Sequence, residues 1–377
     1  MSVEHTGFRE IFNFEHHLSS EGGFVIGPYQ ITVSKELIAG DFALSPRLVF
    51  GGAFDSSGFK NIVTEEPSSS GTWRITAAVA EHEGLHQASA LMPDNPWVDG
   101  AYDLSVILSI LTGRHVLVGN GTKPYMPVSA GQAVTSKNFF RTHPVIDWAL
   151  LSDLREAGAG DAMEAVMLAM TNSNAGVKIA MGSAALDGLN THWFSVADAN
   201  RYTKEVKAKF KAAAQAFKAH LEAACVSQDL IDDMMPRLPG LANESALAKL
   251  TAFLKAAGMY PEDPDEEAPK RLKWLNVLRN SVAHSGSIRL DIAKCPEASL
   301  RIACAVALLL QDICRIYIAK YLLKIEDRGV DEAQQAVMTF FLDGKYNGQD
   351  ILAEDYETYR QRLIDHYEEF GKDRKST

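Results

Sequence analysis

The sequence predicts an α+β protein: a β-rich, sandwich-like domain over 1–145, an all-helical bundle over 146–325 and a helical extension over 326–377. Three observations support this prediction. The chain has 377 residues, enough for two domains. Its first 80 residues contain short apolar runs separated by Gly, Pro, Ser and Asp, which is typical of strands and turns. From about residue 145 the apolar residues instead recur with helical periodicity.

The predicted strands of the N-terminal region lie at 23–26, 29–33, 48–50, 59–63 and 73–79. Glycine pairs such as Gly22-Gly23 and Gly51-Gly52 mark the turns. A short apolar helix is expected over 103–111 and ends before Gly113, after which 114–118 return to the sheet. The fold class follows from this arrangement of strands followed by helices.

Helices are predicted at 147–157, 160–172, 183–194, 198–225, 228–236, 243–257, 269–284, 297–325, 330–343 and 350–371. The helix over 297–325 is apolar almost all round between residues 302 and 310. A helix of this kind is usually buried on most sides. We therefore expect it to be either the centre of the bundle or a dimer interface.

The helix over 269–284 carries the most informative pattern in the chain. At 100° per residue, Asn276, Asn280 and His284 form one polar column, and Arg279 lies at the border between that column and an apolar arc. The arc consists of Leu272, Leu275, Leu278 and Val282. Gly286 provides a C-terminal cap, which places His284 in the last turn, where the helix dipole favours its protonated form.

An arginine and a histidine on one helix edge suit cleavage of a phosphodiester without a metal. Arg279 would bind phosphate through its planar donors, and His284 would transfer protons near neutral pH. Asn280 would orient the imidazole or bind an oxygen of the scissile group, and the 2′-hydroxyl of RNA would be the nucleophile. The same spacing also suits a structural helix in which Arg279 pairs with an acidic neighbour and His284 lies at the surface.

The segment Arg279-Asn280-Ser281-Val282-Ala283-His284 resembles the R-[polar]-x-x-x-H motif of the HEPN superfamily, and the likeness covers about residues 146–325. The β-rich region before it is similar to that of phage-defence proteins of the ApeA type. The resemblance implies a metal-independent endoribonuclease, a toxin or abortive-infection effector, that needs no cofactor and forms its active site across a homodimer. Some members of the superfamily are non-catalytic, so a nucleotide- or RNA-binding or dimerisation module stays open as the alternative.

The charge of the chain is unevenly distributed. The net charge is −11, which argues against general binding of nucleic acid. Residues 201–220, however, hold six basic residues and one acid, and 270–289 hold five basic residues and no acid. The candidate RNA contacts in these two stretches are Lys204, Lys207, Lys211, Lys273 and Asn276.

A second motif, His82-Glu83-Gly84-Leu85-His86, has the H-E-x-x-H form of zinc peptidases. On a helix it would place two imidazoles one turn apart around a metal. Gly84 weakens a helix, however, and no third ligand follows in a convincing context. We therefore expect a strand end or loop here, with a zinc peptidase as the lesser alternative.

Four cysteines without a C-x-x-C pair fit reduced thiols in the cytoplasm. The chain opens with neither a basic nor an apolar signal segment, and its longest apolar run is too short to span a membrane. We expect RNA as the partner of the helical domain and an unknown trigger at the N-terminal domain.

Overall fold

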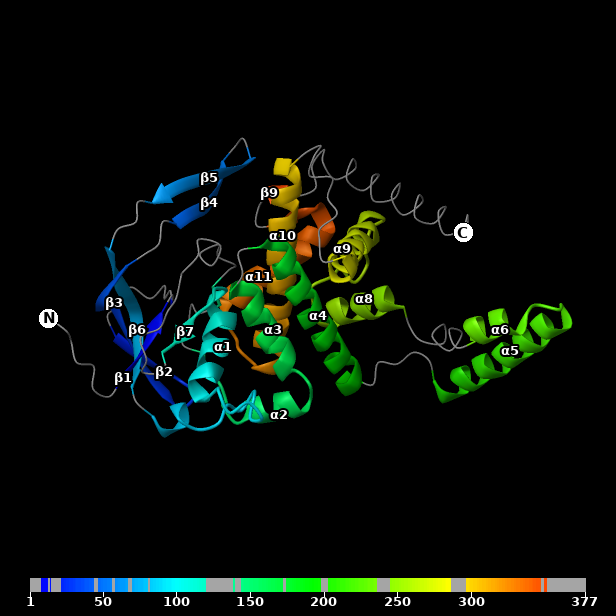
Figure 1. Cartoon of the computed structure of the whole chain (residues 1–377), viewed down its shortest axis with the longest axis horizontal. Helices are drawn as coiled ribbons and strands as arrows, with labels where there is room; N and C mark the ends of the chain where they lie inside the picture. The colour runs from blue at the N-terminus through cyan, green and yellow to red at the C-terminus, as the bar shows by residue number, and fades with distance from the viewer. Residues whose placement is uncertain are drawn as a thin grey trace.

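The structure is a computed structural model that describes residues 8–12, 14, 22–43, 47–55, 58–66, 70–80, 82–119, 138–139, 144–171, 174–197, 203–235, 245–285, 296–346 and 349–350. Six strands come first along the described part of the chain, and helices follow together with the short strands β7 (Leu117–Val118), β8 (Lys345–Tyr346) and β9 (Gln349–Asp350), so the α+β class is confirmed. The sheet lies at one end of the molecule, and the helices extend away from it (Figure 1).

Five antiparallel strands form the main sheet, in the order β2-β3-β6-β1-β7. Their bounds are β1 Phe8–Phe12, β2 Gly22–Ile26, β3 Tyr29–Ala43, β6 Ser70–Ala80 and β7 Leu117–Val118. Strands β4 (Arg47–Asp55) and β5 (Gly58–Glu66) follow β3 and precede β6 along the chain, and they pair with each other as a separate hairpin. A second sheet facing the first, which a sandwich requires, is not among the described elements.

The turn between β2 and β3 ties the sheet to the helical region. Gly27 adopts φ +55°, and a side chain on it would collide with the Trp148 ring, 2.3 Å from the position of its Cβ. Only glycine meets both demands without strain. The Trp148 ring also packs edge-on against Tyr29, with centroids 5.1 Å apart.

Helix α1 (Gly100–Thr112) lies between the sheet and the other helices (Figure 1). Every residue in it except Tyr102 is buried. The Asp99 side chain caps its first turn by accepting from the Ala101 amide, and Gly113 ends it at φ +72°. The hydrophobic core is continuous from the sheet through α1 into the bundle.

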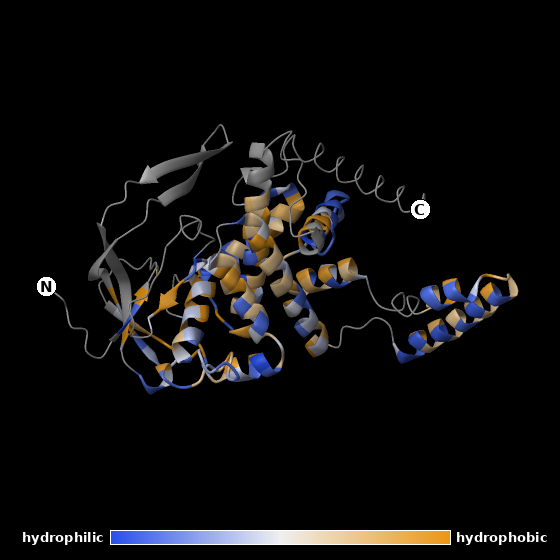
Figure 2. Ribbon diagram, viewed as in Figure 1, coloured by the Kyte–Doolittle hydropathy of each residue, from blue (hydrophilic) through white to orange (hydrophobic). Residues whose placement is uncertain are grey.

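The bundle contains α2 (Leu150–Glu156), α3 (Gly160–Thr171), α4 (Ala175–Ala197), α8 (Ala246–Ala256), α9 (Glu267–Ser285), α10 (Pro296–Ile316), a π-helical turn (Tyr317–Leu322) and α11 (Arg328–Asp343). Helix α10 packs against α3, α4 and α11 and forms the centre of the bundle. Figure 2 shows apolar residues along much of its length. Helix α11 buries Phe340 and Phe341 in the same core, and residues 351–377 lie outside the described set.

A buried arginine joins α10 to the end of α1. Arg315 has no exposed surface and pairs with Asp312 at 2.7 Å. Its guanidinium also donates to the carbonyls of Ile110 (2.6 Å) and Leu111 (3.2 Å), which the last turn of α1 leaves without helical partners. The Phe139 ring covers it at 4.0 Å. The arginine therefore satisfies a helix end that is buried in the core.

Helices α5 (Lys204–Ala223) and α6 (Gln228–Met234) form a hairpin that projects from the bundle (Figure 1). No residue of α5 is buried, and Ile231 is the one buried residue of α6. Val206, Phe217 and Leu230 remain 41%, 40% and 56% exposed. The hairpin thus exposes large apolar side chains as well as its lysines.

Among the described residues, no helix combines the length and the apolar character needed to cross a membrane.

Candidate functional site

The motif lies in the second half of α9, as its periodicity predicts. The Asp265 carboxylate accepts from the Glu267 and Ala268 amides, so the acidic loop caps the start of this helix. Helix α9 packs against α4, α8 and α11, and its backbone stays helical through Ser285. His284 is therefore in the last turn, but its side chain and Gly286 lie outside the described set.

Arg279 is held at the contact between α9 and α4. Its Nη1 pairs with Asp187 Oδ1 at 2.7 Å, and its Nη2 donates to Asn276 Oδ1 at 3.3 Å. The arginine side chain is 6% exposed, whereas that of Asp187 is 60% exposed. The guanidinium therefore lies just beneath the surface, with its carboxylate partner facing solvent. Its Nε is buried without an acceptor in the described part of the chain.

The thiol of Cys314, on α10, lies on the inner side of this pair. Burial raises its pKa well above its usual range, while the charge of Arg279 lowers it and that of Asp187 raises it. The ion pair thus has core on one side and solvent on the other. Sequence reasoning found Arg279 but not Asp187, which precedes it by 92 positions.

Replacing Asp187 by alanine is expected to lower the free energy of unfolding by about 1–3 kcal/mol, because a buried guanidinium loses its carboxylate. Solvent around Asp187 keeps the effect below that of a fully buried pair. Asp187→Asn keeps an acceptor oxygen and should cost less. Urea unfolding followed by circular dichroism measures the free energy of unfolding of the parent and of the two Asp187 variants. The exposed Glu205–Lys209 pair on α5 provides the control, Glu205→Ala, and an equal loss in both alanine variants would contradict the prediction.

The remaining predicted site residues are only partly brought together. Asn276 contacts Arg279, Asn280 is half-buried on the same helix, and Lys273 is exposed one turn before Asn276. The stripe of α5 lysines, Lys204, Lys207 and Lys211, lies well apart from α9 within one chain (Figure 1). Any RNA that contacts both surfaces must therefore extend between them.

The H-E-x-x-H motif does not form a zinc-binding helix, which corrects the zinc alternative. Glu83–Leu85 are a single 3₁₀ turn, so the two imidazoles are not stacked on an α-helical face. His82 caps the turn by accepting from the Gly84 amide at 3.0 Å. No cluster of three potential metal ligands occurs among the described residues.

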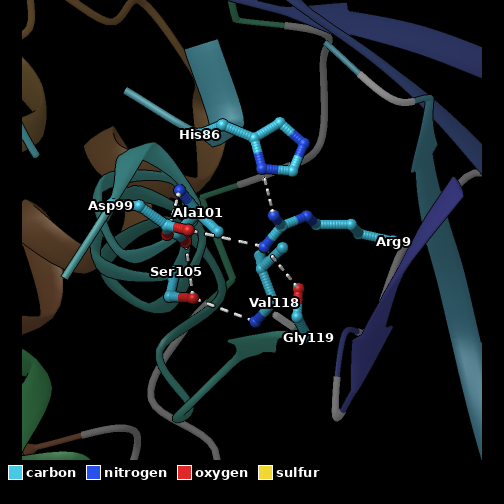
Figure 3. A network of polar contacts seen from close by, with 7 residues as sticks. All are labelled: Arg9, His86, Asp99, Ala101, Ser105, Val118 and Gly119. Carbon is cyan, nitrogen blue, oxygen red and sulfur yellow. Dashed lines mark hydrogen bonds and ion pairs between the residues drawn. The ribbon is translucent and has the colours of Figure 1, made fainter. Parts of the chain in front are cut away.

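His86 instead belongs to a polar network that joins β1 to α1 (Figure 3). Arg9 donates to His86 Nδ1 at 2.8 Å and lies 3.5 Å from Asp99. Because a guanidinium only donates, His86 must accept through Nδ1 and carry its proton on Nε2. Sequence reasoning missed this network because its members come from distant segments.

No family model, curated protein or solved structure significantly matches this chain.

Proposed function

We propose that this chain is a metal-independent endoribonuclease of the HEPN type that works as a homodimer. The observation that carries the proposal is the position of Arg279: a guanidinium held near the surface of α9, five residues before a histidine in the last helical turn. A guanidinium has five N–H donors, and the hydrogen bonds to Asp187 and Asn276 use two of them. One donor on each Nη therefore remains for a phosphate, whereas the Nε donor is buried.

In this proposal Arg279 binds the scissile phosphate and His284 acts as general acid and base. The 2′-oxygen of RNA attacks phosphorus, the bond to the 5′-oxygen breaks, and the leaving oxygen takes a proton. Asn280 orients the imidazole or the phosphate. The C-terminal helix dipole supports the protonated form of His284. Two copies of the motif, one from each subunit, would let one histidine remove a proton while the other supplies one.

The lysines of α5 support RNA as the partner. Lys204, Lys207 and Lys211 recur every three or four residues, so they line one face of a projecting helix. Because the net charge of the chain is −11, RNA is better suited to contact a local group of lysines than a broad part of the surface. The proposal also includes a defence role in the cytoplasm and the sensing of a trigger by the N-terminal region. It further includes sandwich-like packing of the strands in that region.

A second candidate is a non-catalytic RNA-binding or dimerisation module. The Arg279–Asp187 pair favours it, because the carboxylate neutralises the guanidinium that the mechanism requires. The two candidates make different predictions about bond cleavage but the same prediction about binding through α5.

Incubation of the full chain with single-stranded RNA in excess EDTA tests the proposal. We expect cleavage to continue in EDTA and to yield 2′,3′-cyclic phosphate ends, and an RNA with 2′-O-methyl groups should resist it. RNA binding without cleavage would support the second candidate. Cleavage that stops in EDTA would contradict the proposed mechanism.

A further inference from the structure

A cavity of about 700 Å³ lies beside the network in Figure 3 and is not part of the α9 motif. Its walls are the loop after the 3₁₀ turn, the start of α1, strand β7 and one residue of α3, Met167. The polar side chains that line the cavity include those of Asn95 and Asp99. Trp97 also lies at the wall, with 92% of its surface exposed. This volume is within the range of sites for small molecules.

The loop that forms one wall is held rigidly. The buried carboxylate of Asp103 accepts from the Ala90 amide at 2.7 Å, the Leu91 amide at 3.3 Å and the Ser89 hydroxyl. Gly100 approaches the Gly84 carbonyl so closely that a Cβ there would be 1.9 Å from its oxygen. These contacts fix the two ends of the loop against α1, so a ligand would have less of the loop to order.

The charges at the cavity balance. The carboxylate of Asp99 is partnered by Arg9, and burial lowers the pKa of His115, which disfavours the charged form of that ring. A strongly charged ligand would therefore meet no net opposite charge. A neutral ring with polar edges fits better, because the exposed indole of Trp97 can stack on it.

The polar groups narrow the choice among such rings. A carboxylate has about four lone-pair positions. Asp99 Oδ1 uses one for the Ala101 amide at 3.0 Å, Oδ2 forms an ion pair with Arg9 Nη1 at 3.5 Å, and the side chain remains 34% exposed. At least two positions are left to accept a pair of N–H donors. Asn95 Oδ1 accepts a hydrogen bond from the Trp97 backbone amide at 3.0 Å, which leaves the Asn95 side-chain nitrogen to donate.

We propose that this cavity binds a guanine base, with N1–H and the N2 amino group donating to Asp99, O6 accepting from Asn95 and the ring stacked on Trp97. Among the common bases, guanine presents two adjacent donors and one acceptor on one edge. Adenine presents an acceptor where guanine has N1–H. The same chemistry is found in a free guanosine nucleotide and in an unpaired guanine of RNA.

Isothermal titration of the full chain with guanosine, inosine and adenosine tests this proposal without reference to RNA cleavage. We expect guanosine to bind at least tenfold more tightly than adenosine, with inosine between them because it lacks the N2 amino group. GMP represents the free nucleotide, and a single-stranded tetranucleotide with one guanine represents RNA. The ligand that binds more tightly indicates which of these two sources supplies the guanine. Equal affinity for guanosine and adenosine, or no binding of any guanine-containing probe, would overturn the proposal.

Two variants locate the site. Asp99→Asn keeps a helix cap but replaces one acceptor oxygen by a donor, so guanosine affinity should fall at least tenfold. Trp97→Ala changes an exposed residue, leaves the fold intact and should reduce affinity about 5- to 100-fold through lost stacking. Asp94→Asn is the matched control, because Asp94 is on the same loop with a 90% exposed side chain, pairs with Arg155 and does not line the cavity. Unchanged affinity in both site variants would refute the proposed site.

Discussion

Replacing His284 by alanine is expected to reduce RNA cleavage by the full chain roughly 100- to 10,000-fold, the usual contribution of general acid–base catalysis. RNA binding should persist, because the histidine transfers protons and the lysines of α5 supply the contacts to phosphate. Initial rates on an end-labelled RNA in EDTA, together with a binding isotherm for the same RNA, measure the two effects separately.

His220 provides a matched control for this variant. It is also a histidine in the last turn of a helix, α5, and it is exposed. His220→Ala should cleave at the parent rate. Arg279→Lys adds a second comparison, because it keeps the positive charge but loses the planar donors. If His284→Ala cleaves as fast as the parent, the proposed role of the imidazole is wrong; an equal loss in His220→Ala would trace the effect to RNA binding or folding.

Replacing Arg315 by methionine is expected to lower the free energy of unfolding by about 3–5 kcal/mol. The change leaves the carboxylate of Asp312 buried without its cation and removes the donors that satisfy the Ile110 and Leu111 carbonyls. Methionine keeps much of the side-chain volume. The loss of stability therefore comes from the unpaired polar groups more than from a cavity. Urea unfolding monitored by circular dichroism measures it.

Two further variants identify the cause of that loss. Arg328→Met removes an arginine that is 81% exposed and paired with Glu332 at 3.0 Å, so it should cost less than about 1 kcal/mol. In the double variant Asp312→Leu with Arg315→Met, part of the stability should return, because no unpaired charge stays in the core. A loss in Arg315→Met no greater than that in Arg328→Met would contradict the structural role of the buried pair.

Local pattern predicted the secondary structure well where the periodicity was strong. The helices expected at 160–172 and 228–236 are observed as Gly160–Thr171 and Gln228–Met234. The helix expected from residue 183 begins eight residues earlier, at Ala175, because its buried face extends to Lys178 and Ile179. Strand β1 was not predicted, since its alternating residues occupy only five positions in a polar segment.

The sequence alone determined that α9 is a helix carrying an arginine at the edge of its apolar face, because periodicity depends on near neighbours along the chain. Tertiary structure alone decided that this arginine meets Asp187, and that Arg9 meets both His86 and Asp99. Such contacts join residues 77 to 92 positions apart, and their formation depends on how whole elements pack. Packing also decided that His82 and His86 do not share a helical face, since a single 3₁₀ turn separates them.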